Sequence, residues 1–133
     1  MDTLVNTLED LCVNGRSIAN YPLRCYDELF VTKRKKYEGR VATKINEWHL
    51  EEKPIIMFWE KDNPSRSTLC RVSDFKFYPG PSEAFDDLGD QLLPGLSRDE
   101  MVEFYYKTLG FEEAIKQHGF VAIKLEIILS EKN

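Results

Sequence analysis

A basic segment in the first third of the chain holds the residues best suited to chemistry. It spans residues 33–44 and reads KRKKYEGRVATK, with six basic side chains and one acidic side chain. The segment therefore carries a net charge of +5, whereas the whole chain carries −5 and the remainder −10. One concentrated positive site on an acidic protein predicts a defined anionic ligand.

The spacing of three charged residues indicates how this segment would recognise an anion. In an extended strand, Lys36, Glu38 and Arg40 point to one face, while Tyr37 and Val41 point to the other. The three charges then lie within about 13 Å along one line. The planar guanidinium matches phosphate geometry, and the carboxylate can accept hydrogen bonds from a base amino group or hold the cations in place. The alternative is an exposed edge strand whose charges discourage aggregation.

Aromatic residues that follow the basic segment are candidates for stacking on a nucleobase. Trp48, Phe58 and Trp59 are the nearest, and an exposed ring contributes about 1–3 kcal/mol per stacked base. Most aromatic side chains in a chain of this size belong to the core, however. We expect Lys44 to help hold phosphate or a base edge together with Lys36 and Arg40, and we expect Trp48 to stack.

The sequence lacks the motifs of several common enzyme classes. It holds no phosphate-binding glycine-rich loop, no dinucleotide fingerprint, no His-Glu-x-x-His and no Gly-x-Ser-x-Gly. Its two histidines, His49 and His118, lie far apart. His118 precedes Gly119 at a predicted helix end, where a cation suits the helix dipole. The sequence therefore predicts neither a metal site nor a cofactor.

Length and composition predict one intracellular domain. The 133 residues are enough for one hydrophobic core, and three widely spaced cysteines do not form a disulfide framework. No apolar run reaches the roughly 18 residues of a membrane span, and the N-terminus has no secretory signal pattern. We expect a cytoplasmic or nuclear protein without a membrane partner. A pI near 5.1 argues against nonspecific binding to duplex DNA but permits a pocket for one or a few nucleotides.

Hydrophobic periodicity predicts a mixture of helices and strands. The predicted helices cover residues 4–12, 26–30 and 111–118. A further predicted helix begins at the Ser97 capping box and ends before Gly110. The predicted strands cover residues 36–44, 54–59, 67–78 and 121–129, the last with Val121, Ile123, Leu125, Ile127 and Leu129 on one face.

The third predicted strand contains an irregularity. Its apolar positions change parity between Val72 and Phe75, which predicts a β-bulge. Adjacent strands without intervening helices exclude a regular βαβ array. The predicted fold is therefore α+β, with a mainly antiparallel, partly closed barrel flanked by helices. The acidic residues 83–90 are expected to form solvated surface, or to repel longer polyanions and so favour small ligands.

Several short motifs together resemble the ASCH domain, a small relative of the PUA-like RNA-binding barrels. Members carry a Gly-x-Lys-Thr-x-Glu-x-Arg-like strand soon after a short helix, and residues 35–40 resemble its Lys-Thr-Val-Glu-Gly-Arg variant. The other matching motifs follow in the family's order, at residues 55–58, 70–78, 93–95, 97–106 and 119–123. The resemblance covers about residues 23–128. Residues 1–133 are thus expected to form one ASCH/PUA-like domain, with a helix over residues 2–13 as an addition.

The resemblance implies a cleft between barrel and helices that recognises RNA or a nucleotide, marked by Lys35, Glu38 and Arg40. Some members are amidohydrolases that act on acetylated cytidine with a Lys and a Thr hydroxyl in this motif. Lys35 matches that Lys, whereas Glu38 stands where the hydroxyl would be. Glu38 would then act as a general base toward water, with Lys35 stabilising an oxyanion. A second departure is Lys53-Pro54 in place of the usual Gly-Asp turn.

Three hypotheses follow. In the first, the protein binds single-stranded RNA or a nucleotide, with single-stranded DNA as an alternative ligand. Lys35 and Glu38 would line the pocket, which requires an irregular strand start because Lys35 and Lys36 face opposite ways on an ideal strand. In the second, Lys35 and Glu38 are catalytic residues that hydrolyse a modified nucleoside such as N4-acetylcytidine. In the third, the N-terminal helix or the acidic segment binds a protein partner.

Overall fold

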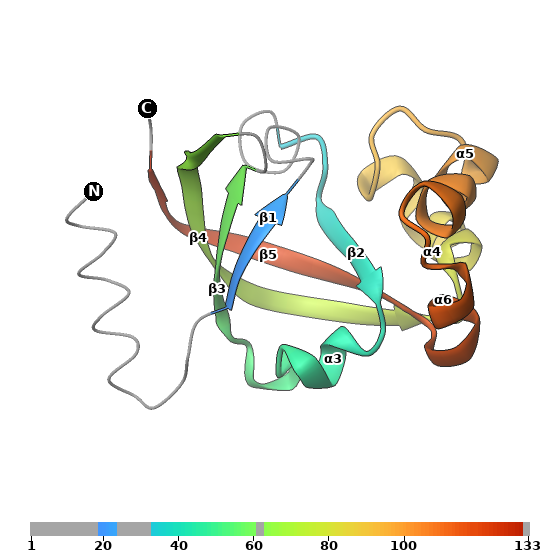
Figure 1. The fold of residues 1–133 in the computed structure, drawn as a ribbon, viewed down its shortest axis with the longest axis horizontal. Helices are drawn as coiled ribbons and strands as arrows, with labels where there is room; N and C mark the ends of the chain where they lie inside the picture. The colour runs from blue at the N-terminus through green and yellow to red at the C-terminus, as the bar shows by residue number, and fades with distance from the viewer. Residues whose placement is uncertain (1–18, 24–32, 61–62, 132–133) are drawn as a thin grey trace.

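The computed structural model describes residues 19–23, 33–60 and 63–131, and Figure 1 shows its elements. The strands are β1 (Ala19–Leu23), β2 (Tyr37–Val41), β3 (Ile55–Glu60), β4 (Asn63–Tyr78) and β5 (Phe120–Glu131). The helices are α3 (Lys44–Glu47), α4 (Pro81–Leu88), α5 (Arg98–Glu103) and α6 (Glu112–His118). Short 3₁₀ turns cover Leu50–Glu52 and Gly89–Gln91, and a π-helical turn covers Phe104–Thr108. The helices predicted over residues 2–13 and 26–30 lie outside the described residues.

The described strands form one five-stranded sheet in the order β1-β3-β4-β5-β2. Each neighbouring pair is antiparallel except β1 and β3, which are parallel. The sheet curls, and α4, α5 and α6 gather at one end of it, on the right of Figure 1. The predicted α+β class, with a mainly antiparallel, curved sheet flanked by helices, is confirmed.

The bulge predicted from the change of parity is present in β4. Its pairing with β5 shifts register between Val72 and Asp74, so Ser73 is the extra residue. The Ser73 hydroxyl donates to the backbone carbonyl of Lys124 at 3.2 Å. The bulge thus lies within the predicted interval and has its own hydrogen bond to the neighbouring strand.

A second irregularity, between Leu69 and Cys70, was not predicted. Here Ile128 on β5 is the extra residue, and it is 41% exposed. Ile127 beside it is 36% exposed. The apolar face predicted along β5 is therefore buried at Val121 and Ile123 but partly exposed at Ile127. The side chain of Leu129 lies outside the described part of the structure.

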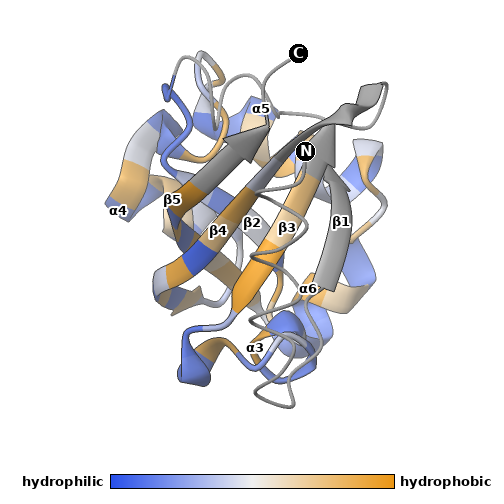
Figure 2. Ribbon diagram, turned by 90° about the vertical axis from the view of Figure 1, so that its left-hand side faces the viewer, coloured by the Kyte–Doolittle hydropathy of each residue, from blue (hydrophilic) through white to orange (hydrophobic). Residues whose placement is uncertain are grey.

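Two hydrophobic clusters meet at the start of β5. Val121 and Ile123 belong to the cluster between the sheet and the α3 region, while Phe120 and Ala122 belong to the cluster under the helices. Successive residues of a strand point to opposite faces, so β5 serves both clusters at once. Figure 2 shows the hydrophobic colouring that runs along β3 into the first cluster. The junction between sheet and helices is therefore fixed on both faces.

Helix α5 begins as the sequence predicts. The Ser97 hydroxyl accepts from the Glu100 backbone N–H at 3.2 Å, and the Glu100 carboxylate accepts from the Ser97 N–H at 2.9 Å. Gly110 follows the π-helical turn with a φ of 73°, and α6 ends at His118 as expected.

The sequence did not predict three of the elements, α3, α4 and β1. Most of residues 83–90 belong to α4, and their acidic side chains, Glu83, Asp86, Asp87 and Asp90, are exposed as expected for solvated surface. Pro81 occupies the first turn of this helix, where its fixed φ is favourable.

Candidate functional site

The basic segment lies where the sheet meets the helical layer. Strand β2 pairs with β5 from Tyr37 opposite Lys124 to Val41 opposite Phe120. Residues 33–36 form neither helix nor strand. The Lys36 backbone N–H donates to the carbonyl of Gln91, at the end of the 3₁₀ turn Gly89–Gln91, at 2.7 Å. The strand therefore begins irregularly, and the predicted extent of 36–44 was too long at both ends.

Lys35 is buried beside Glu38. Its side chain is 1% exposed, and its Nζ lies 3.3 Å from Glu38 Oε1. The same Nζ donates to the backbone carbonyl of Leu92. An ammonium group withdrawn from water requires such partners.

Lys36 does not join this group. Its side chain is exposed, whereas Glu38 is buried, and β2 begins only at Tyr37. The predicted row of Lys36, Glu38 and Arg40 required an extended strand, and β2 does not include Lys36. The irregular start of the strand turns Lys35 toward Glu38 instead.

Glu38 and Arg40 form a second ion pair, two residues apart on β2. Arg40 donates to Glu38 Oε2 from Nε at 3.1 Å and from Nη2 at 2.8 Å. Burial alone would raise the pKa of Glu38. The charges of Arg40 and Lys35, with their hydrogen bonds, outweigh this effect and lower the pKa from its ordinary value of 4.5. Glu38 is therefore a carboxylate at neutral pH, held between two cations.

Arg40 and Lys44 both lie over the ring of Trp48. The guanidinium carbon is 5.2 Å from the ring centroid, and Lys44 Nζ is 5.7 Å from it. Cations within about 6 Å of an indole are attracted to its face. Lys44 Nζ also lies 2.9 Å from Glu47 on α3. We call Lys35, Glu38, Arg40 and Lys44 the basic site.

Trp48 is a core residue in this structure. It is 4% exposed and meets Phe58 edge-on, with ring centroids 6.2 Å apart. Its ring supports the two cations and presents no open face for a base, so the expectation that Trp48 stacks on a ligand is corrected. Phe58 is fully buried, and the side chain of Trp59 lies outside the described part of the structure.

Gly39 has a role that the sequence did not predict. A side-chain carbon at this position would overlap the hydroxyl of Tyr105 and the ring of Phe120. Only glycine allows β2 to lie this close to the helical layer. Tyr105 belongs to the π-helical turn, a geometry often found near functional sites. The signal was available in the sequence, because an isolated glycine within a strand indicates close approach of another group.

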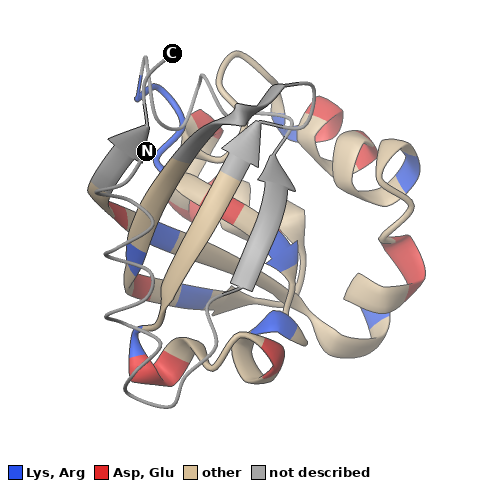
Figure 3. Cartoon of the chain, turned by 60° about the vertical axis from the view of Figure 1, so that its left-hand side comes forward, with Lys and Arg blue, Asp and Glu red and all other residues tan. Residues whose placement is uncertain are grey.

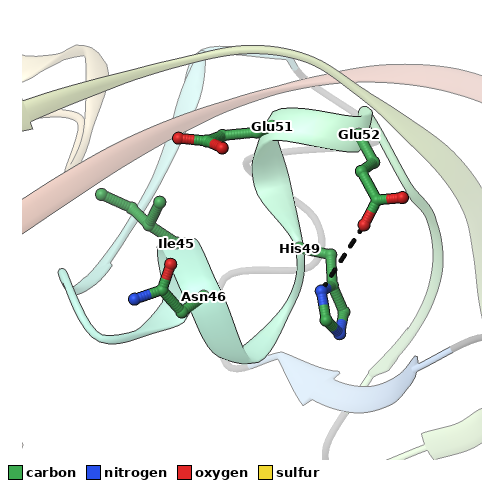
Figure 4. Close-up of a pocket in the computed structure, with 5 residues that line it drawn as sticks. All are labelled: Ile45, Asn46, His49, Glu51 and Glu52. Atoms are coloured by element: carbon green, nitrogen blue, oxygen red, sulfur yellow. Dashed lines mark ion pairs between the residues drawn. The ribbon is translucent and has the colours of Figure 1, made fainter.

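A separate surface pocket lies beside α3 (Figure 4). It has a volume of about 260 Å³ and is lined by Ile45, Asn46, His49, Glu51 and Glu52. His49 Nδ1 lies 3.5 Å from a carboxylate oxygen of Glu52. The pocket shares no residue with the basic site, and its two carboxylates do not suit an anionic ligand.

Metal chemistry has no support among the residues that the structure describes. No group of three or more His, Cys, Asp or Glu side chains is placed there to hold a metal ion. Burial raises the pKa of the Cys70 thiol to about 12, which makes it unreactive.

Among the residues that the structure describes, no helix has the length and apolar character needed to cross a membrane.

The chain is similar to three solved structures. The crystal structure of hypothetical protein PH0355 is 28% identical with a TM-score of 0.66, over 83% of this chain and 97% of that one. The NMR structure of protein PF0455 from Pyrococcus furiosus is 27% identical with a TM-score of 0.61, over 84% and 96% of the two chains. Protein EF3133 from Enterococcus faecalis V583, of family model DUF984, is 13% identical over 96% and 91%, with a TM-score of 0.61, which shows a shared fold. No family model and no curated protein matches the chain.

Proposed function

We propose that this protein is an ASCH-type, PUA-like domain that binds single-stranded RNA or a nucleotide through the basic site. The placement of Arg40 carries the proposal. Its Nε and Nη2 are engaged by Glu38, and its guanidinium lies over Trp48. Its side chain is 20% exposed, which leaves Nη1 to donate to an oxygen of the ligand.

The rigidity of this arginine favours binding. A free arginine loses side-chain entropy when it captures an anion, whereas Arg40 is already held on two sides. Its planar fork suits a phosphate or a base edge. Lys44, 25% exposed and over the same indole, supplies a second cation.

The role we assign to Glu38 is to position the two cations. One carboxylate oxygen faces Lys35 and the other accepts twice from Arg40. Little of its hydrogen-bonding capacity remains for a base amino group. Of the two roles considered from the sequence, holding the cations is therefore the better supported.

Hydrolysis of a modified nucleoside remains a prediction with less support. A general base works best with a pKa near the operating pH, but the neighbouring cations lower the pKa of Glu38 below 4.5. Lys35 is engaged by Glu38 and by the Leu92 carbonyl, which leaves it poorly placed to stabilise an oxyanion. Incubation of concentrated protein with N4-acetylcytidine tests this route, and turnover that Glu38→Gln abolishes would establish it.

The binding proposal is tested by fluorescence anisotropy with a labelled single-stranded RNA of eight nucleotides. Arg40→Ala should weaken binding by about 10- to 100-fold, the range for a lost charged hydrogen bond. Arg98→Ala is the matched control, because Arg98 also pairs with a carboxylate, Asp86 at 3.0 Å, but lies on α5. Equal small losses in both variants, with the fold of each confirmed by NMR, would refute the proposal.

A further inference from the structure

The helical layer next to the basic site is strongly acidic. Residues 81–118, which include α4, α5 and α6, contain nine acidic and three basic residues, a net charge of −6. Figure 3 shows several of these acidic residues on the helices. A polyanion that ran over these helices would be repelled along its length.

The basic segment touches this layer directly. The Lys36 N–H donates to the Gln91 carbonyl, and Lys35 Nζ donates to the Leu92 carbonyl. Asp90 lies beside these acceptors and is exposed. The positive region therefore ends where the helical layer begins, so a bound strand cannot extend across that boundary without facing acidic residues.

Most cations of the basic site are already balanced. Lys35 and Arg40 share Glu38, and Lys44 pairs with Glu47. These three cations and two carboxylates leave a local charge of only +1. The exposed cations that add to it are Lys33, Arg34 and Lys36, on the coil that leads into β2.

We infer that the ligand of the basic site is a nucleotide or a short oligonucleotide, with no more than about five phosphates engaged, and not a long single strand. This inference rests on the proposed function. The five phosphates correspond to the accessible cations Lys33, Arg34, Lys36, Arg40 and Lys44, since Lys35 is buried and engaged. Single-stranded ligands lose affinity with salt by about 0.7 logarithmic units per phosphate contact, so the slope should be no steeper than about −3.5.

The test measures the affinity for oligouridylates of about 1, 4, 8 and 16 nucleotides, lengths that lie on both sides of this phosphate count, at several salt concentrations. Affinity should rise up to about five nucleotides and then level off, after correction for the number of binding registers. A 16-nucleotide ligand that binds more than about tenfold tighter than the 8-nucleotide ligand, with a salt slope steeper than about −4, would overturn the inference while leaving the binding function intact. Absence of binding at every length would remove the proposed function itself.

Asp90→Asn tests the contribution of the acidic layer. An asparagine retains an oxygen that can accept the Gly95 N–H now bound by Asp90 Oδ2 at 2.9 Å. Removing this charge should improve binding of the longest ligand by about twofold relative to the 4-nucleotide ligand at low salt. Glu126→Gln, an exposed acid on β5 outside the layer, is the control and should change neither. An unchanged length preference in Asp90→Asn would contradict repulsion by the layer.

Discussion

Replacing Glu38 with glutamine should reveal how much the buried ion pairs stabilise the fold. The amide keeps the shape of the side chain but removes the charge that faces Lys35 at 3.3 Å and Arg40 at 2.8 Å. Lys35, with a side chain 1% exposed, would retain the Leu92 carbonyl as a partner for its charge. Removing one member of a buried pair costs about 3–5 kcal/mol. Arg40 is partly exposed and can regain water, so we expect a loss of about 3 kcal/mol, at the lower end of that range.

Urea denaturation followed by circular dichroism measures this loss. With a slope of about 1.5 kcal/mol/M, a loss of 3 kcal/mol lowers the midpoint by about 2 M. Glu47→Gln is the matched control, because Glu47 pairs with Lys44 at 2.9 Å but is 52% exposed. It should change stability by less than about 0.5 kcal/mol. A loss below about 1 kcal/mol in Glu38→Gln would show that Glu38 behaves as a surface residue and would refute the reasoning.

A double-mutant cycle separates the cost of leaving the buried Lys35 ammonium without its carboxylate partner from the other effects of Glu38→Gln on stability. Lys35→Met removes the buried charge and keeps a side chain of similar length. If the unpaired ammonium causes most of the loss, Lys35→Met combined with Glu38→Gln should be more stable than the sum of the single changes predicts, by at least about 1 kcal/mol. Additive losses of stability in the two single variants would show that the unpaired Lys35 ammonium does not cause most of the loss in Glu38→Gln.

Three further changes have defined outcomes. The pKa of Glu38 is lowered in the folded protein, so its ion pairs add stability above the ordinary value of 4.5 that is lost as the pH falls through the folded value. The stability difference between the wild type and Glu38→Gln should thus be constant near neutral pH and shrink below about pH 4 in urea titrations; a constant difference down to about pH 2 would contradict this. Gly39→Ala should destabilise by about 2 kcal/mol in thermal unfolding, because the methyl group overlaps Tyr105 and Phe120, whereas Gly80→Ala, whose nearest neighbour is 3.2 Å away, should cost less; equal losses would oppose the steric explanation. Ser97→Ala should cost about 1 kcal/mol through loss of its part of the capping box, and no change relative to Ser82→Ala, in a helix without a side-chain cap, would argue against that contribution.

Short-range patterns in the sequence were enough to predict much of the fold. The bulge near Val72, the capping box at Ser97 and the helix end at His118 each depend on a few neighbouring residues. The fold class followed from the order of such elements. Helix α4 was missed because its acidic residues also suit a solvated loop, and only its packing through Ala84 and Leu88 distinguishes the two.

The location of the basic site was also contained in the sequence, as a cluster of positive charge on an acidic chain. The sequence identified Lys35, Glu38 and Arg40 as a group through the resemblance of residues 35–40 to a known motif. It did not determine which side chains face solvent. The strand period assigned Lys36 to the row of charges, and that assignment holds only where the chain is a regular strand.

Tertiary contacts decided the arrangement within the site. The carbonyl that binds Lys35 belongs to Leu92, 57 residues away, so no local pattern could place that ammonium in the interior. Trp48 was equally ambiguous, since an indole next to lysines suits a stacking surface or a core. Packing against Phe58, beneath Arg40 and Lys44, made it part of the core. The sequence by itself determined the charges and their order along the chain, whereas burial decided which of them are engaged and which remain open to a ligand, because burial depends on segments that meet only in the folded protein.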